Sequence, residues 1–232
     1  MQDLDWIRVN PGSATLGSND RSILRGGMGP RHQVKISKSF EITKHPVPAK
    51  IALEMIKSGE AEVASESEWA VSKAQGHIYA ELGTIETLAD SASNYWGKPC
   101  DGRAWTGDGE VRTRRVRVWS ARGISESTRP IEIADSHPLR LVRRESKYSE
   151  TPIRLPGAGD ATRILKQEVV ICLATGILPS FTWAWFNASP GYIADGWLNL
   201  VMGGVFFGLS TAILWRPKTP TYIQTESGWK LE

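Results

Sequence analysis

The chain has 232 residues, of which 28 are Lys or Arg and 25 are Asp or Glu, so its formal net charge is +3. This small excess does not indicate a nucleic-acid-binding protein, which carries a strongly basic face. The two cysteines, Cys100 and Cys172, lie in different kinds of sequence. We therefore expect no disulfide, which fits a reducing compartment. The mean hydropathy of −0.28 averages a long polar segment and an apolar one.

The polar part of the chain predicts short and irregular elements. Val34–Ile36 and Phe40–Ile42 indicate two short strands on either side of a Ser-Lys-Ser turn. Pro48 fits the first position of a helix that ends just before Gly59. Proline is favoured at the first helical position and glycine after the last, so both residues support this interpretation.

A second helix and two further strands follow. Ser65 and Glu68 have the spacing of a capping box, which predicts a helix over 66–74. Arg115–Ser120 alternates as a strand does, and Leu139–Val142 indicates another short strand. The polar part therefore predicts one domain with few regular elements and many loops.

Two apolar runs near the C-terminus are the strongest feature of the sequence. Val169–Phe186 and Gly196–Trp215 are separated by a polar turn, and Asp195 is the only charged residue between Glu168 and Arg216. At about 1.5 Å per residue the runs extend roughly 27 and 30 Å, which matches a bilayer core of about 30 Å. Neither run has the polar face of a soluble helix. We therefore favour a transmembrane hairpin over two buried core helices.

Aromatic residues mark the ends of these runs. Trp183 and Trp185 end the first run, Trp197 opens the second and Trp215 closes it. Tryptophan is enriched at both water–lipid boundaries, so we expect these four residues to anchor the hairpin at the membrane interfaces. Pro179 removes a backbone donor within the first run and is expected to kink it.

The charged residues that flank the hairpin predict its orientation. Arg154, Arg163 and Lys166 precede the first span, Arg216 and Lys218 follow the second, and the connecting turn has no Lys or Arg. The positive-inside rule then places the N-terminal domain and the C-terminal tail in the cytoplasm. We expect a two-span protein of the inner or plasma membrane. The first ten residues show no basic or apolar region, so no signal peptide is expected.

Glycines provide a packing signal within the membrane runs. Gly204 and Gly208 are four residues apart and lie on one helix face, Gly203 broadens that face, and Gly176 lies in the first run. Such small residues allow helix backbones to approach closely. Two interpretations stay open, which are packing within the hairpin and contact with a helix of another subunit.

Basic residues of the polar part cluster in two regions. A solvated or salt-bridged surface is the more ordinary interpretation of such clusters. The alternative is contact with anionic lipid headgroups or with an acidic partner near the membrane. The candidate contact residues are Arg112, Arg114, Arg115, Arg143, Arg144 and Lys147.

Seven segments, in this order, resemble the formylglycine-generating enzyme family, also called the sulfatase-modifying-factor domain. They cover roughly residues 6–144 and are Val9–Ser18, Pro30–Ile36, Phe40–Val47, Ala64–Gly76, Ile85–Asp90, Arg115–Gly123 and Pro138–Val142. The resemblance implies a C-type-lectin-like core that is rich in loops. It also implies a calcium site and a pair of cysteines that hold copper and activate oxygen.

The sequence departs from this family where the family's chemistry lies. Ser125–His137, which corresponds to the region of the cysteine pair, contains no cysteine. Soft thiolate ligands select Cu(I), so copper-dependent catalysis is not expected here. The calcium-binding residues are replaced around Gly83–Glu86. The histidines do not have the spacing of metal ligands, and we expect neither a metal nor another cofactor.

We therefore expect an α+β, lectin-like domain over 1–150, a linker over 151–167, a transmembrane hairpin over 168–216 and a C-terminal tail over 217–232. The expected function is that of a non-enzymatic accessory subunit. It would brace a larger membrane assembly, for example a respiratory or photosynthetic complex. Its partners would be lipid and other integral membrane subunits, with no nucleic acid or small-molecule substrate. The alternatives are a membrane-anchored oxidoreductase with an altered metal site and a membrane-anchored ligand-binding sensor.

Overall fold

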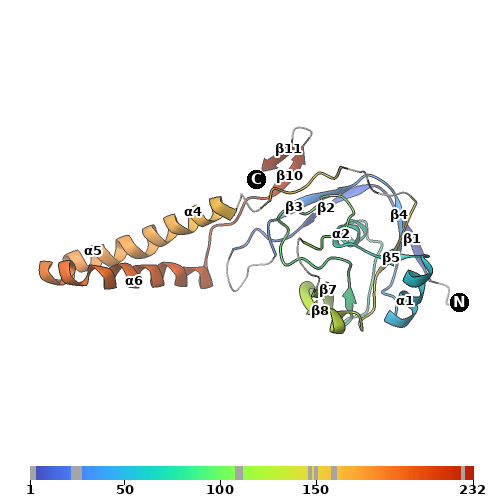
Figure 1. Cartoon of the computed structure of the whole chain (residues 1–232), viewed down its shortest axis with the longest axis horizontal. Helices are drawn as coiled ribbons and strands as arrows, with labels where there is room; N and C mark the ends of the chain where they lie inside the picture. Colours follow the sequence, from blue (N-terminus) through green and yellow to red (C-terminus); the bar gives the residue numbers. More distant parts are fainter. Residues whose placement is uncertain are drawn as a thin grey trace. The chain divides into compact units, whose positions relative to one another are not determined.

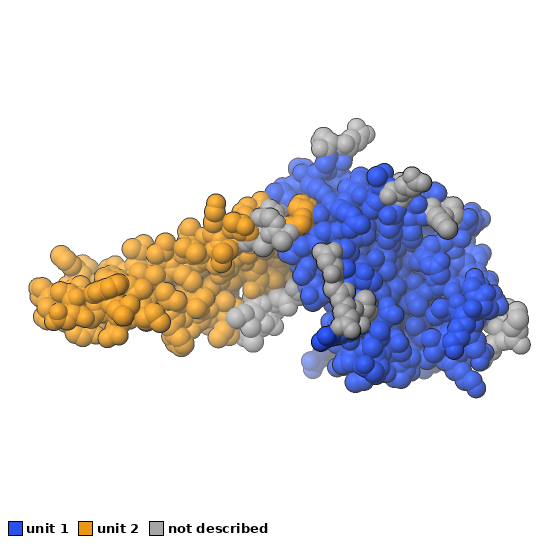
Figure 2. All heavy atoms as spheres, viewed as in Figure 1, with its two compact units in different colours: residues 1–17, 28–155, 221–232 blue, residues 18–27, 156–220 orange. Residues whose placement is uncertain are grey.

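The computed structural model of the chain divides into two compact units (Figure 2). The first contains residues 1–17, 28–155 and 221–232, and the second contains residues 18–27 and 156–220. The residues that the structure describes are 4–21, 28–107, 112–145, 148, 151–157, 161–225 and 228–232. The prediction of an α+β soluble part followed by two long apolar helices is confirmed.

The described strands of the first unit form three small sheets (Figure 1). One is antiparallel and has the order β1-β4-β9-β5, with strands Trp6–Val9, Phe40–Thr43, Leu141–Arg144 and Glu62–Val63. The next has the order β11-β10-β3-β2, with strands Gly228–Leu231, Tyr222–Thr225, His32–Ile36 and Gly12–Leu16. The third has the order β6-β7-β8, with strands Ile85–Thr87, Thr113–Ser120 and Gly123–Pro130.

Two helices of this unit lie where the sequence predicts them, although Pro48 precedes the first helical residue of α1 and does not occupy its first position. α1 spans Ala49–Ser58, directly after Pro48, and Gly59 ends it in the left-handed conformation with φ of 76°. α2 spans Glu66–Ala74, and its capping box is complete at both ends of the first turn. A short helix, α3, spans Ile131–Ala134.

The last residues of the chain belong to the first unit. The segment expected as a tail contains β10 and β11, which form an antiparallel hairpin. β10 also pairs in parallel with β3 through Tyr222 and His32. The ring of Tyr222 is 2% exposed and makes edge-on contacts with Trp96 and Trp229. These contacts close a sheet whose strands come from both ends of the chain.

Buried ion pairs lie beside the apolar core of this unit. Arg140 and Glu86 are both fully buried, and the Arg140 Nε donates to a Glu86 carboxylate oxygen at 2.6 Å. The indole nitrogens of Trp69 and Trp119 donate to the other oxygen of Glu86, at 2.8 and 2.6 Å. A buried charge is tolerated only where it is paired and hydrogen-bonded in this way. The carboxylate therefore joins α2, β6, β7 and the residue that precedes β9.

A buried histidine predicts a pH dependence of stability. His32 is fully buried, and its Nδ1 lies 2.9 Å from the carbonyl oxygen of Pro30. Burial lowers the pKa of His32 from 6.5 to about 4. The unfolded chain then binds this proton more tightly than the folded one does, so stability falls as the pH drops from about 6.5 to about 4. We expect a loss of about 2 kcal/mol between pH 7 and pH 5.

Thermal denaturation of the full chain in detergent, followed by tryptophan fluorescence at both pH values, measures this loss. His32→Asn keeps a side-chain donor near Pro30 and removes the titrating group. The variant should show a flatter pH profile than the wild type. An unchanged profile would show that His32 does not cause the loss.

Candidate membrane-docking site

The second unit contains two antiparallel helical arms (Figure 1). The first arm is continuous over α4 (Ala161–Cys172), a π-helical turn η2 (Leu173–Ile177) and α5 (Leu178–Asn187). The second arm is α6 (Pro190–Leu214). Both arms are long and apolar enough to cross a membrane, and only 11% and 17% of their most apolar stretches are buried. A core helix of a soluble protein would be mostly buried. Most of the apolar surface of these two arms is instead not covered by the rest of the protein.

Three of the four glycines singled out in the sequence form the contact between the arms. A methyl group added to Gly176 would overlap the carbonyl oxygen of Gly204. One added to Gly204 would lie 2.6 Å from the Cα of Ile177. One added to Gly208 would lie 2.8 Å from the Cα of Cys172. The two backbones therefore touch along this seam, as small residues permit.

Gly203 does not belong to the seam. It is exposed, and a methyl group added there would meet no atom within 4 Å. The adjacent Gly204 is buried because one residue of helix corresponds to a rotation of about 100°. Gly203 therefore opens on the outer side of α6, away from the seam.

The irregularity expected at Pro179 takes a specific form. The α-helix is interrupted by the π turn η2 immediately before Leu178, and Pro179 lies in the first turn of α5. Proline is favoured in a first turn because its missing N–H would have no partner there. The π turn also contains Gly176, so it lies at the contact with α6.

The tryptophans expected at the membrane boundaries all lie on the surface of the hairpin. Trp183 and Trp185 are 62% and 76% exposed near the end of α5, and Trp197 is 54% exposed in the first half of α6. Trp215 is 60% exposed, directly after α6. These positions suit indole rings at the two water–lipid boundaries of a spanning hairpin.

A polar cluster ties the two open ends of the hairpin together. Arg216 is 4% exposed, and its guanidinium group donates to Glu168 at 3.0 Å, to the Gly208 carbonyl oxygen at 3.0 Å and to the Thr211 hydroxyl. Glu168 also pairs with Arg21, which precedes the hairpin by more than a hundred residues in sequence. Arg216 thereby adds a donor to a carbonyl group in the last two turns of α6, and its positive charge suits the C-terminal end of the helix dipole.

Removing Arg216 should loosen the hairpin at this end. Arg216→Leu leaves Glu168 with one cationic partner fewer and removes a donor from the Gly208 carbonyl group. Because Glu168 is 29% exposed, we expect a loss of about 2 kcal/mol, below that for a fully buried pair. Detergent-to-SDS unfolding followed by circular dichroism measures it. The exposed Lys218 provides the control, and Lys218→Leu should change the stability by less than about 0.5 kcal/mol. Equal effects of the two substitutions would contradict the role of Arg216.

The arginines of the first unit that are candidates for headgroup or partner contact differ in how deeply they are buried. Arg115 is 4% exposed and pairs with Glu66 at 3.1 Å. It is therefore an internal ion-pair partner, and its side chain does not lie at the surface where a lipid headgroup could contact it. Arg117 pairs with the same carboxylate. Burial alone would raise the pKa of Glu66, but the guanidinium groups of Arg117 and Arg115 lower it. This pairing corrects the assignment of Arg115.

The other candidates lie closer to the surface. The Arg143 guanidinium lies 4.1 Å from the ring centre of Trp6. Arg114 lies 3.9 Å from an oxygen of Asp135 and donates to a backbone carbonyl group, and Arg112 is exposed. Lys147 lies outside the described residues. Arg112, Arg114 and Arg143 therefore stay candidates for contact with a headgroup or partner.

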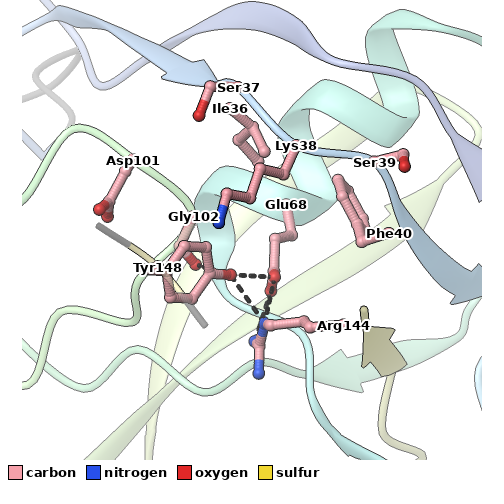
Figure 3. Close-up of a pocket in the computed structure, with 10 residues that line it drawn as sticks. All are labelled: Ile36, Ser37, Lys38, Ser39, Phe40, Glu68, Asp101, Gly102, Arg144 and Tyr148. Carbon is pink, nitrogen blue, oxygen red and sulfur yellow. Dashed lines mark hydrogen bonds and ion pairs between the residues drawn. The ribbon is translucent and has the colours of Figure 1, made fainter. Parts of the chain in front are cut away.

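Arg144 belongs to a small pocket that the sequence did not indicate (Figure 3). The pocket has a volume of about 80 Å³, and Glu68, Arg144 and Tyr148 meet in it. Arg144 donates to both oxygens of Glu68, at 2.7 and 2.9 Å, and the Tyr148 hydroxyl donates to the same carboxylate. The remaining lining residues are Ile36, Ser37, Lys38, Ser39, Phe40, Asp101 and Gly102.

The groups in this pocket are engaged with one another. One oxygen of Glu68 accepts from the Ser65 backbone N–H at 2.8 Å, so the carboxylate also caps α2. Burial and the Glu68 charge raise the pKa of Tyr148, which keeps its hydroxyl neutral and able to donate. An ionised carboxylate has about four lone-pair sites, and four donors occupy those of Glu68. The polar groups of the pocket therefore serve to hold α2, β9 and Gly102 together.

Neither Cys100 nor Cys172 forms a disulfide. Cys100 is 2% exposed, and burial raises its pKa to about 12. A reactive or metal-binding cysteine needs its thiolate form, and this environment opposes it. Cys172 lies in the hairpin against Gly208. Within the described part of the chain, no three His, Cys, Asp or Glu side chains gather so as to hold a metal ion.

Comparison with known proteins adds little to this description. The sequence matches no family model and no curated protein. Among solved structures, the chain is similar to PvdO from Pseudomonas aeruginosa, with 14% sequence identity and a TM-score of 0.40. That match covers 60% of this chain and 94% of the other. A likeness of this degree supports no conclusion about function.

Proposed function

We propose that this chain is a non-catalytic accessory subunit of a larger membrane protein assembly. The observation that carries the proposal is the hairpin, whose two arms pack closely through glycines while their large apolar side chains point outward. A hairpin of this kind anchors a chain and offers a surface to other transmembrane helices. It has no buried charge in its apolar stretches that would indicate a path for solutes.

The first unit supports this proposal because its buried carboxylates are paired with arginines and its cysteine is a buried thiol. Glu66, Glu68 and Glu86 are fully buried and are held by arginines, and Cys100 is a buried thiol of high pKa. Carboxylates paired in this way and a thiol of high pKa are not poised for chemistry. The segments that resemble the formylglycine-generating enzyme family fit the same view, as a lectin-like scaffold retained without the cysteine pair. The assembly would belong to an energy-transducing membrane, respiratory or photosynthetic.

Purification in a mild detergent from the native membrane, followed by native mass measurement, tests the proposal. An accessory subunit should purify with a fixed set of larger membrane proteins in constant ratio. A chain that purifies alone or as a homodimer would instead favour the ligand-binding sensor. Metal analysis of the same sample addresses the oxidoreductase, because copper or iron in stoichiometric amount would contradict a non-catalytic role.

The proposed topology places the first unit in the cytoplasm, as the positive residues beside the hairpin indicate. Protease added to right-side-out cells should then leave the first unit intact, whereas protease added to inverted vesicles should degrade it. Digestion from the outside would contradict this orientation.

A further inference from the structure

We propose that the side chains of Lys98 and Asp90 are joined by an amide bond, which the folded chain forms from its own groups. The two residues lie eight positions apart in the sequence, after strand β6. The bond would close the segment 90–98 into a covalent ring beside the start of α2. The cross-link is a modification of the chain itself, and it does not depend on the proposed function.

The first observation is the kind of cation that is buried. Lys98 is fully buried, and it is the only lysine among the buried residues of the described part of the chain. The buried side chains of fixed positive charge are all arginines, namely Arg115, Arg117, Arg140 and Arg216. A guanidinium group stays charged in proteins, whereas a lysine in a water-poor environment can lose its proton and act as a nucleophile. Lys98 is therefore the buried cation that can react as an amine.

The second observation is the position of this amine beside a carboxyl group. The Lys98 Nζ lies 3.7 Å from the Oδ1 of Asp90, and the two side chains are 0% and 2% exposed. The Nζ also donates to the Ser67 Oγ at 2.9 Å, which holds the amine in place. Oδ1 is bonded to the carbon that the amine would attack, so rotations of the lysine chain bring the nitrogen toward the roughly 3–3.5 Å of reacting atoms.

The third observation is the set of donors on the carboxyl group. The backbone N–H of Trp105 donates to the Asp90 Oδ1 at 2.9 Å, and that of Glu66 donates to Oδ2 at 2.6 Å. Negative charge develops on a carboxyl oxygen when an amine adds to the carbon, and fixed donors stabilise that charge. Burial raises the pKa of Asp90, Lys98 opposes the rise and the Glu66 charge adds to it. A raised pKa favours the carboxylic acid, which is the form that can lose a hydroxyl group.

The reaction replaces an ion pair by an amide and a molecule of water. One proton passes from Nζ to the Asp90 carboxylate, which leaves an amine and a carboxylic acid. A bond then forms between Nζ and Cγ, and the bond between Cγ and the protonated oxygen breaks. The hydroxyl group leaves as water together with a second proton from the nitrogen, so no oxidant, reductant or cofactor takes part. Removing two charges from the interior favours the amide, because buried charges are costly.

Peptide mass spectrometry of the full chain, purified in detergent, tests the proposal. Trypsin should release residues 74–103 as one peptide, because Pro99 protects the bond after Lys98. We expect this peptide to be lighter than its sequence mass by one water molecule and to give no fragment ions from cleavage between positions 90 and 98. A peptide of full sequence mass would overturn the proposal. Loss of water with a complete series of fragment ions would also overturn it, because that result shows a cyclic imide at Asp90 without a cross-link.

Two variants and a labelling experiment confirm which nitrogen is used. Lys98→Arg keeps the positive charge but has no amine, so its peptide should have the full sequence mass. Lys50→Arg is the matched control, since Lys50 is exposed, and its 74–103 peptide should still lack one water molecule. An amine-reactive reagent added to the wild-type chain in denaturant should modify Lys50 and leave Lys98 unmodified. Labelling of Lys98 to the same extent as Lys50, or loss of water that persists in Lys98→Arg, would contradict the cross-link.

Discussion

Gly204→Leu is expected to separate the two arms of the membrane hairpin. A side chain at this position would lie 2.6 Å from the Cα of Ile177 and 2.8 Å from its nitrogen, and backbone atoms cannot move aside without parting the helices. Overpacking a close contact costs about 2 to 3 kcal/mol even where neighbouring side chains can adjust, and here they cannot. We therefore expect a loss of about 3 kcal/mol in the stability of the hairpin.

Gly203→Leu is the matched control for this prediction, because the same change is made one residue away. Its side chain enters open space, so it should lower the stability of the isolated hairpin by less than about 0.5 kcal/mol. Detergent-to-SDS unfolding, followed by circular dichroism, compares the two variants. Equal stability of the two would show that α6 does not use the Gly204 face against the first arm. The two glycines should thus separate by phenotype, with Gly204→Leu impairing the hairpin and Gly203→Leu leaving it intact.

The two arms could be predicted from the sequence because hydropathy and length are local properties. The role of each glycine could not, because it depends on how α6 is rotated about its axis. A π turn shifts the rotation of the first arm at Leu173–Ile177, and neither its position nor its effect follows from residue spacing. The sequence therefore placed Gly203 beside the face of Gly204 and Gly208, whereas the structure leaves Gly203 outside their contact with the first arm.

The interior arginines show a second limit of sequence interpretation. Arg115 and Arg117 alternate with valines in a strand, which is typical of arginines that face solvent. In the structure, both are buried because Glu66 approaches β7 from the first turn of α2. The capping box predicts where that helix begins. The pairing of Glu66 with Arg115, however, is a contact between residues about fifty positions apart in the sequence. No local pattern carries that information.

The C-terminal hairpin has a local sequence signal, whereas its pairing with β3 does not. Tyr222–Thr225 and Gly228–Leu231 contain aromatic and β-branched residues, and Gly228 lies between the apolar residues of the two segments, which is typical of a hairpin. Their pairing with β3 joins residues about 190 positions apart, so the sheet itself was not predictable from spacing. The short strands and helices of the N-terminal half were predictable because their caps and turns are local.

Arg140→Met is expected to destabilise the first unit more than any surface substitution in it. Arg140 donates to Glu86 and also to the carbonyl oxygens of Thr43, Lys44 and Tyr79, at 2.9, 2.7 and 3.2 Å. Methionine fills a similar volume but leaves a buried carboxylate without its cation and three carbonyl groups without this donor. Breaking a buried pair in this way costs about 3 to 5 kcal/mol. The melting temperature of the first unit, measured by tryptophan fluorescence in the full chain, should fall by about 10 °C.

Two comparisons separate the charge effect from a general loss of packing. Arg143→Met removes a guanidinium group that lies over Trp6 near the surface, so it should cost less than about 1 kcal/mol. Combining Arg140→Met with Glu86→Gln removes the unpaired charge while an amide oxygen still accepts from Trp69 and Trp119. The double variant should therefore be more stable than Arg140→Met alone by about 1 to 2 kcal/mol. If the losses of the two single variants simply add in the double variant, the unpaired charge does not contribute to the loss caused by Arg140→Met. An unpaired buried charge would be removed by Glu86→Gln, and part of the stability would then return.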